Sequence, residues 1–269
     1  MEKAKVYFTD MRAYPGLNLQ QKLEKLIRRA GIEKIDFEDK FAAIKIHFGE
    51  PGNLSYLRPN FAKTVADVVK SLGGKPFLTD CNTLYVGRRK NALDHMDAAY
   101  ENGFSPFSTG CHVIIADGLK GTDEVEVPVD GGEYVKNAKI GRAVMDADIF
   151  ISLAHFKGHE STGFGGAIKN IGMGCGSRAG KMEMHCGGKP DVDKALCRSC
   201  HMCERNCAHG AISFDQEKRA QIDHEKCVGC GRCIGACNFD AIANQNYHAN
   251  DELNCKMAEY AKAVVDGRP

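Results

Sequence analysis

Eight cysteines arranged in two runs carry the most specific chemistry in this sequence. The runs occupy residues 197–207 and 227–237, and in each one three cysteines are separated by two residues and a fourth follows after three more. This spacing suits a [4Fe–4S] cube, whose four irons each take one thiolate, because the fourth cysteine of each run then reaches the other cube. We therefore predict a first cluster on Cys197, Cys200, Cys203 and Cys237, and a second cluster on Cys227, Cys230, Cys233 and Cys207.

Zinc sites and a disulfide framework are the alternatives for these cysteines. Zinc sites typically use two pairs of cysteines, each with a two-residue spacer, that are separated by a longer loop. Disulfide frameworks are typical of small secreted chains, whereas this chain has 269 residues and no secretory signal pattern in residues 1–10. Two matched runs of four cysteines therefore favour the cubes.

The segments that follow the two runs favour an internal duplication. Ile212 and Ile242 stand at equivalent positions after the runs, each preceded by an alanine. This duplicated pattern resembles the two-cluster bacterial ferredoxin fold, and the resemblance implies that the two isoleucines cover the clusters. Ala208 and Asn238 stand where bacterial ferredoxins usually carry proline, a difference that removes no ligand.

A second set of chemically active side chains follows two apolar segments of the chain. His47 comes directly after one segment, and His155, Lys157, His159 and Lys169 follow the other in a glycine-rich stretch. Glycines let the backbone approach a ligand closely, and backbone N–H groups in such loops bind anions. Lysine adds positive charge, and histidine exchanges protons near neutral pH. We predict that these five residues form a catalytic pocket in which the lysines hold an anionic substrate and the histidines handle protons.

Two other interpretations of the glycine-rich stretch remain open. The first is a linker to the cysteine runs, although linkers are seldom so rich in histidine and lysine. The second is a single metal ion held by His155, His159, His185 and Cys175. The stretch contains neither the P-loop pattern nor the dinucleotide-binding pattern of glycines, so we predict no nucleotide site of those two kinds.

The elements that must position these residues alternate between strands and helices. Hydrophobic periodicity predicts strands at residues 5–9, 41–48, 76–79, 111–116, 123–129 and 148–153, and helices at residues 18–30, 61–72, 91–101, 139–145 and 251–265. This alternation indicates an α/β fold with a mainly parallel sheet and helices on both faces. Ligands of such sheets bind beyond the carboxyl ends of the strands, and we expect the pocket residues there. A small α+β ferredoxin-like domain with two clusters completes the predicted fold.

Composition narrows the classes of function. The chain has 43% hydrophobic residues, 26% charged residues and a net charge of +1, which is typical of a globular protein that does not bind nucleic acid. No apolar run reaches the roughly 18 residues that a membrane span needs, so we predict a cytoplasmic protein without membrane contact. Free thiols beside iron–sulfur clusters indicate a reducing, anaerobic cytoplasm. Five further cysteines have no predicted role: Cys81, Cys111, Cys175, Cys186 and Cys255.

Several stretches of the chain resemble one known family. Residues 45–49, 57–59, 73–80, 82–85, 91–95 and 155–175 resemble the family called domain of unknown function 362. The resemblance covers nearly the whole chain and implies an α/β fold with a two-cluster ferredoxin module in this position, but no settled reaction. Longer members continue past the last predicted helix with a further α/β segment. The resemblance therefore implies a chain shortened at its C-terminus, with a sheet edge that a partner would complete.

These observations lead to one hypothesis and two alternatives. We expect an α/β domain at residues 1–188, a domain with two [4Fe–4S] clusters at residues 189–246, and a C-terminal helix within residues 247–269 that returns to the α/β domain. The leading hypothesis is an iron–sulfur protein, an oxidoreductase if the pocket turns over a substrate, that carries electrons to an anionic substrate or a redox partner protein at the pocket. The alternatives are a non-enzymatic carrier or complex subunit, and a binding or maturation protein with structural clusters. Each is compatible with an oligomer.

Overall fold

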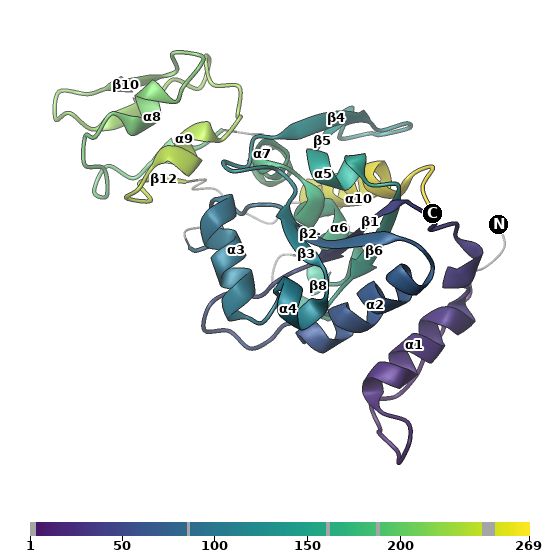
Figure 1. The fold of residues 1–269 in the computed structure, drawn as a ribbon. Helices are drawn as coiled ribbons and strands as arrows, with labels where there is room; N and C mark the ends of the chain where they lie inside the picture. Colours follow the sequence, from purple (N-terminus) through teal and green to yellow (C-terminus); the bar gives the residue numbers. More distant parts are fainter. Residues whose placement is uncertain (1–3, 85–86, 160–161, 187–188, 244–250) are drawn as a thin grey trace.

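A four-stranded parallel sheet lies at the centre of the fold in the computed structural model, which describes residues 4–84, 87–159, 162–186, 189–243 and 251–269 (Figure 1). The sheet contains β1 (Phe41–Ile46), β2 (Lys75–Asp80), β3 (His112–Ile115) and β6 (Ile149–Leu153) in the order β3-β2-β1-β6. Its three strand pairs are all parallel. The predicted α/β fold with a mainly parallel sheet is therefore confirmed.

Helices cover both faces of this sheet, as the alternation of elements predicts. One face is covered by α2 (Pro59–Ser71) and α3 (Ala92–Glu101), with α1 (Leu19–Ala30) and α4 (Pro106–Thr109) packed against α2. The other face is covered by α6 (Ala167–Cys175), which contacts β1 and β6, and α10 (Asp251–Val265) packs on α6. Each helix thereby buries its apolar side against the sheet or against another helix.

Because side chains alternate along β1, a lysine of this strand points to the face of the sheet that α6 covers. Ile44 and Ile46 are buried in the core beneath α2, and neighbouring residues of a strand point to opposite faces. Lys45 therefore points toward α6, where its Nζ donates to Asn170 Oδ1 at 2.8 Å. A cation is thus fixed inside the protein by strand geometry.

The packing of α10 on α6 depends on a glycine. A Cβ atom added at Gly172 would lie 2.1 Å from the backbone oxygen of Met257 in α10. Only a residue without a side chain allows the two backbones to come this close. The contact holds α10 over the same face of the sheet that Lys45 points to.

The predicted limits of most elements agree with the structure to within a few residues. α1 begins after Asn18, whose side chain accepts from Gln21 N at 2.9 Å, and ends at Gly31, which has a φ of 98°. The short helix η1 (Ile32–Lys34) follows. The strand predicted at residues 5–9 is wrong, since no neighbouring strand pairs with it among the described residues, and Val6 and Phe8 are largely exposed.

Two further stretches also differ from the prediction. The helix expected at residues 139–145 is instead β5 (Asn137–Gly141) followed by the shorter α5 (Arg142–Asp146), because β5 pairs antiparallel with β4 (Glu124–Pro128). The glycine-rich stretch is not one loop. It forms a hairpin of β7 (Lys157–His159) and β8 (Gly163–Gly165) and then enters α6.

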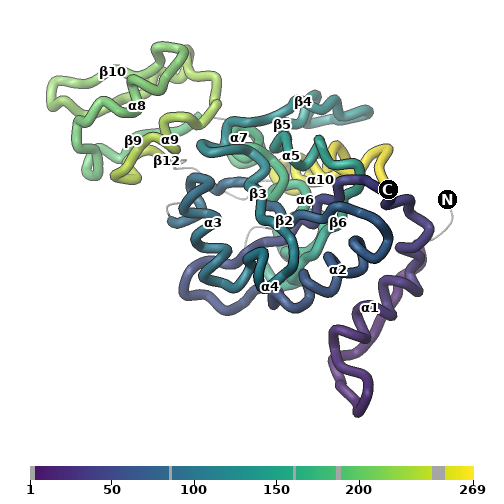
Figure 2. The backbone as a smooth tube through the Cα atoms, viewed as in Figure 1, coloured from purple at the N-terminus to yellow at the C-terminus, as the bar shows by residue number. Residues whose placement is uncertain are grey.

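Residues 189–243 form a cysteine-rich module at the end of the molecule opposite α1 (Figure 2). Its paired strands are β10 (Ile212–Phe214) with β11 (Ala220–Ile222), and β9 (Asp191–Val192) with β12 (Ile242–Ala243). Its short helices, α8 (Met202–Arg205) and α9 (Arg232–Ala236), contain the third cysteine of each run. α7 (Arg178–Cys186) precedes the module. The domain limits predicted at residues 188/189 and 246/247 border on or lie within stretches outside the described residues.

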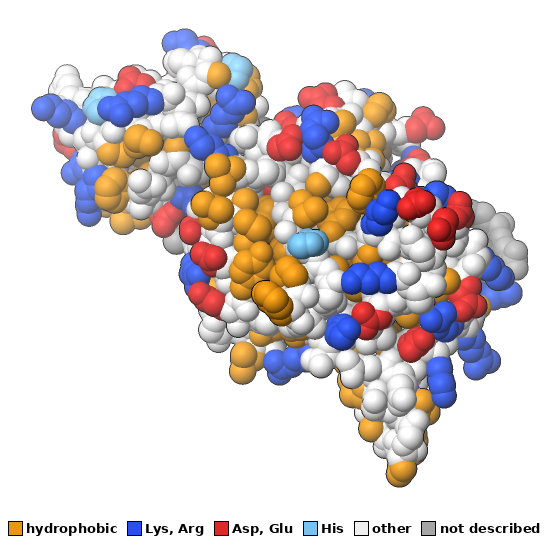
Figure 3. Space-filling view, in the orientation of Figure 1, with side chains coloured by type: hydrophobic (Ala, Val, Ile, Leu, Met, Phe, Trp, Pro, Cys, Tyr) orange, Lys and Arg blue, Asp and Glu red, His pale blue; other side chains and the backbone are white. Residues whose placement is uncertain are grey.

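Acidic and basic side chains are interspersed on the face drawn in Figure 3, and hydrophobic side chains gather over its middle. β3 is an edge strand of the sheet, and its Ile114 is 42% exposed. Within the described ranges, no helix combines the length and the hydrophobicity that crossing a membrane requires.

Candidate functional site

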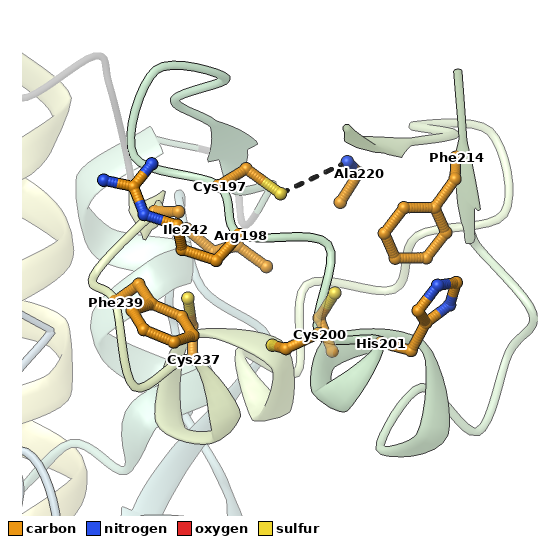
Figure 4. Close-up of a pocket in the computed structure, with 11 residues that line it drawn as sticks. Cys197, Arg198, Cys200, His201, Phe214, Ala220, Cys237, Phe239 and Ile242 are labelled. Atoms are coloured by element: carbon orange, nitrogen blue, oxygen red, sulfur yellow. Dashed lines mark hydrogen bonds between the residues drawn. The ribbon is translucent and has the colours of Figure 1, made fainter. Parts of the chain in front are cut away.

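The first cavity of the cysteine-rich module is surrounded by four cysteines from both runs. Cys197, Cys200 and Cys237 point toward a common space, with Ile242 beside them (Figure 4). Cys203 of α8 lines the same cavity. The fourth cysteine of the second run thus lies with three cysteines of the first run, which is the set assigned above to the first cluster.

The second cavity repeats this arrangement with the complementary cysteines. Its lining includes Ile212 at the position that Ile242 takes in the first cavity, and four cysteines: Cys207, Cys227, Cys230 and Cys233. Cys233 in α9 and Cys237 at the C-terminal end of this helix line different cavities, although they lie only four residues apart.

The surroundings of these thiols suit a bound anionic cluster. Backbone N–H groups are directed at sulfur atoms in both cavities: Ala220 N lies 3.5 Å from Cys197 Sγ, and Ala211 N lies 3.4 Å from Cys207 Sγ. Burial raises the pKa of the Cys233 thiol to about 12, so an unligated thiol there stays protonated. A coordinating metal deprotonates a thiol outright. The residues present therefore fit a metal cluster that takes thiolate ligands.

The geometry also bears on the disulfide and single-metal alternatives. No disulfide joins the cysteines that the structure describes. In the same part of the chain, no three His, Cys, Asp or Glu side chains gather closely enough to hold one metal ion. A cubane distributes its four thiolates over four irons and does not need such a group. Cys175, a ligand in the single-metal interpretation, is fully buried in the apolar core.

A separate cavity of about 600 Å³ lies at the carboxyl ends of β1, β2 and β6. The chain runs from β1 to β2 and β3 on one side and places β6 on the other, so strand order reverses between β1 and β6. Ligands of open α/β sheets bind at such a point. The cavity is lined by all five predicted pocket residues: His47, His155, Lys157, His159 and Lys169. Burial and nearby Arg89 lower the pKa of His47 to about 4.

Buried charges form one wall of this pocket. Lys45 Nζ lies 3.1 Å from Asp80 Oδ1, and Arg89 Nη1 lies 3.4 Å from Asp80 Oδ2. His95 Nε2 lies 3.9 Å from the same carboxylate oxygen. Burial alone would raise the pKa of Asp80, but Lys45, His95 and Arg89 together hold it well below its usual value. Asp80 is therefore ionised and fixes the two cations in place.

Further positive charge reaches the pocket from α6 and α7. Lys169 Nζ lies 2.8 Å from His159 Nε2, and the buried Lys181 of α7 also lines the pocket. Burial, followed by the charges of Lys169 and Lys181, lowers the pKa of His185 to about 4. His47 and His185 are therefore neutral at pH 7, and the basic side chains of the pocket also include Lys45, Lys157, Lys169 and Lys181. The pocket therefore favours an anionic ligand.

α7 connects this pocket to the cysteine-rich module. Lys181 and His185 line the pocket, while Met182 is buried among Cys197, Cys203, Cys233 and Cys237. Neighbouring residues of one helix thus face the pocket and the cysteines.

The sequence analysis missed several residues of the pocket. It did not include Lys45, Asp80 or Arg89 among the pocket residues. A lysine in the middle of an apolar strand is the signal that could have revealed Lys45. The cysteines without a predicted role are placed as follows: Cys81, Cys111 and Cys175 are buried, Cys255 is partly buried, and the side chain of Cys186 lies outside the description.

Two characterised relatives match short stretches of the chain. A subunit of the ion-translocating oxidoreductase complex of Methanosarcina acetivorans is 46% identical over 46 residues, which are 17% of this chain and 17% of that protein. A ferredoxin of Pyrobaculum islandicum is 28% identical over 69 residues, which are 26% of this chain and 64% of that protein. The chain thus spans less than two thirds of the length of either relative.

Comparison with solved structures gives the lactate racemase apoprotein of Thermoanaerobacterium thermosaccharolyticum, with a TM-score of 0.43 and 12% sequence identity. That similarity covers 90% of this chain and 55% of the other. A family profile described as Domain of unknown function (DUF362) matches residues 42–269. This range includes the sheet, the pocket and the cysteine-rich module. The chain therefore belongs to the DUF362 family.

Proposed function

We propose that this chain is an iron–sulfur electron-transfer protein and that it passes electrons to an acceptor bound in the pocket of the α/β domain. The observation that carries the proposal is the exchange of the fourth cysteine between two otherwise matched cavities. A ligand set divided in this way is the one that two [4Fe–4S] clusters of the bacterial ferredoxin type use. The short matches to a ferredoxin and to one component of an oxidoreductase complex support the same function.

The proposed clusters would transfer electrons one at a time, and the residues of the chain would hold the acceptor near the clusters. Cys197, Cys200, Cys203 and Cys237 would hold one cluster, and Cys207, Cys227, Cys230 and Cys233 would hold the other. Met182 and Lys181 are consecutive residues that contact the cysteine side and the pocket side of α7. An acceptor in the pocket would therefore lie close to the module.

The pocket residues would bind an anionic acceptor and exchange protons with it. Lys157, Lys169 and Lys181 would attract the acid groups. Leu84, Leu153, Met173, Leu253 and Met257 provide apolar walls for the rest of the molecule. His47 is neutral at pH 7 because its pKa is about 4, so it would accept a proton only from a stronger acid. These features fit a small organic anion with an apolar body.

A carrier that passes electrons to another protein is the second candidate. It is favoured by the exposed Cys200 on the first cavity, which a partner protein could approach. The match to one component of an oxidoreductase complex is compatible with a partner of this kind. In that function the α/β domain would serve as a docking surface.

The first experiment counts iron and sulfide in protein purified without oxygen. About eight irons and eight sulfides per chain are expected for two cubes, and a content near one or two metal ions would refute the proposal. The second experiment mixes chemically reduced protein with either the small-molecule or the protein fraction of a cell extract and follows its reoxidation.

The two fractions separate the candidate functions. If the pocket binds the acceptor, small molecules reoxidise the wild-type protein, while the double variant His155→Ala/Lys157→Ala keeps reducible clusters but reoxidises slowly. If the chain is only a carrier, the protein fraction alone reoxidises both forms. If neither fraction reoxidises the protein, the clusters have a structural role.

A further inference from the structure

The guanidinium group of Arg178 is buried between α7 and the cysteine-rich module without a salt bridge. Its side chain is 0% exposed. Its hydrogen bonds go to backbone oxygens: Nε donates to Lys120 O at 3.0 Å, Nη1 donates to Thr83 O at 3.2 Å, and Nη2 donates to Lys90 O. Among the ion pairs of the described residues, none includes Arg178. A buried charge that lacks a counter-charge strongly destabilises a protein.

Asp117 is the carboxylate whose charge acts most strongly on Arg178, and one of its two oxygens accepts hydrogen bonds from Asn82. Asp117 Oδ1 accepts from Asn82 N at 2.9 Å and from Asn82 Nδ2 at 2.8 Å. Its other oxygen, Oδ2, is buried and accepts no hydrogen bond from the residues described here. Burial raises the pKa of Asp117 to about 6. A Cβ atom added at Gly121 would lie 3.1 Å from both Asp117 Oδ2 and Arg178 Nη2. Asp117 therefore lies near the guanidinium group but makes no hydrogen bond to it, and its charge is shared with Lys181.

The guanidinium group lies directly against the helix that carries cysteines of both cavities. A Cβ atom added at Gly235 of α9 would lie 3.5 Å from Arg178 Cζ, and one added at Gly231 would lie 2.7 Å from Arg178 Cγ. Gly231 lines the second cavity. The guanidinium group of Arg178 therefore lies beside the helix that carries Cys233, a residue of the second cavity.

We infer that Arg178 is the internal counter-charge of the iron–sulfur cluster held by Cys207, Cys227, Cys230 and Cys233, and that it raises the reduction potential of this cluster. The inference rests on the proposed function. Reduction adds negative charge, and a cation in a surrounding of low dielectric constant favours that added charge much more than an exposed cation does. This cluster would then be the one that retains the electron more readily.

Arg178 also connects the cysteine-rich module to the pocket through hydrogen bonds. Thr83, whose carbonyl oxygen accepts from Arg178, lines the pocket. Lys90, whose carbonyl oxygen also accepts from Arg178, donates from its Nζ to Cys237 O at 2.9 Å. Hydrogen bonds through Thr83 and Lys90 therefore connect the guanidinium group to the pocket wall and to the module. Arg178 is a positioning residue, since it contacts no predicted substrate.

The test compares three variants with the wild-type protein in anaerobic redox titrations followed by EPR. Arg178→Gln removes the buried charge, and Arg178→Lys keeps a charge but loses the fork of hydrogen bonds. Arg232→Gln is the matched control, because Arg232 is an exposed arginine that lines the second cavity. Iron content is measured for each variant, so that a missing cluster is distinguished from a shifted potential.

The expected result is a more negative potential for one cluster in Arg178→Gln, with a smaller shift in Arg178→Lys and the smallest shift in Arg232→Gln. Both potentials unchanged in Arg178→Gln would overturn the inference while leaving the proposed function intact. If Arg178→Gln loses one cluster and Arg178→Lys keeps both, the requirement for charge supports the inference. If both variants lose the cluster, Arg178 serves packing and the inference fails. A wild-type protein without iron would instead refute the proposed function.

Discussion

Lys45 and Asp80 form a salt bridge of 3.1 Å in which the two side chains are only 1% and 4% exposed. The residues come from neighbouring parallel strands, where Lys45 pairs in register with Thr79, the residue before Asp80. Asp80 also accepts from Cys81 N at 2.9 Å. The pair thus fixes the ends of two strands and places a cation at the wall of the pocket.

The first prediction concerns the loss of Asp80. Asp80→Asn should lower the free energy of unfolding by about 3–5 kcal/mol, because it leaves Lys45 buried without its carboxylate. Lys45→Met should cost less, since Asp80 keeps Arg89 at 3.4 Å. Urea unfolding followed by circular dichroism measures both changes. The matched control is Lys40→Met, which breaks the exposed Lys40–Asp36 pair and should change stability little. Equal effects of Asp80→Asn and Lys40→Met would contradict the prediction.

The second prediction tests how the cysteines divide between the two cavities. Cys207→Ser and Cys233→Ser should remove the same cluster, whereas Cys203→Ser should remove the other one, although Cys203 and Cys207 lie only four residues apart. The cluster that remains should therefore give the same EPR spectrum in the first two variants and a different spectrum in the third. Cys255→Ser, outside the module, should keep the full iron content. Identical spectra for Cys203→Ser and Cys207→Ser would show that the fourth cysteine is not exchanged.

The third prediction concerns the acid sensitivity caused by His95. Its ring is fully buried, and neither nitrogen has a hydrogen-bond partner within the described part of the chain. Burial, opposed by Asp80, lowers the pKa of His95 to about 3. The unfolded chain takes up this proton below about pH 6.5, and the folded chain does not. His95 therefore stabilises the fold fully above pH 6.5, and this contribution is lost as the pH falls toward 3.

His95→Phe should remove this dependence, since phenylalanine cannot take up a proton. Relative to this variant, the wild-type protein should lose up to about 2 kcal/mol of its free energy of unfolding between pH 7 and pH 5. Urea titrations at both pH values measure it. The exposed His112 provides the control, because His112→Phe replaces a histidine at the surface and changes no buried ring. A constant difference for His95→Phe would contradict the assigned pKa.

The prediction for the cysteine sites rests on local spacing within each run. Cys203 in α8 and Cys207 just after it line different cavities. The wall of the pocket is different. Lys45 and Asp80 meet only because β1 and β2 pair in one register, and register depends on the whole sheet.

The wrongly predicted helix at residues 139–145 has a similar cause. Ala138 and Ile140 are buried and alternate with more exposed residues, as in a strand, but this pattern is too short to be recognised next to the helical residues 142–146. Pairing with β4 decides the outcome. Arg178 shows the same limit at the level of charge, because its lack of a carboxylate partner is visible only once α7 lies against α9.

The fourth prediction concerns the contact between the α/β domain and the cysteine-rich module. Lys90 is 8% exposed, and its Nζ donates to Cys237 O at 2.9 Å and to Asp240 Oδ1 at 2.5 Å. Lys90→Met leaves Asp240 and a carbonyl oxygen of the module without this donor, at a cost of about 1–3 kcal/mol. Because the contact joins two units, its loss should let the module open before the α/β domain unfolds.

Thermal unfolding of the cluster-loaded protein separates these two events. The visible absorbance of the clusters should be lost at a lower temperature in Lys90→Met than in the wild-type protein, while the helical signal in the far ultraviolet should change less. Lys120→Met is the matched control, since Lys120 is exposed and its Nζ contacts Asn206 Oδ1 of the module at a longer distance of 3.4 Å. In Lys120→Met, the cluster absorbance and the helical signal should be lost at the same temperatures as in the wild-type protein. If Lys90→Met shifts both signals equally, the module and the α/β domain unfold as one cooperative unit, and Lys90 stabilises the fold as a whole.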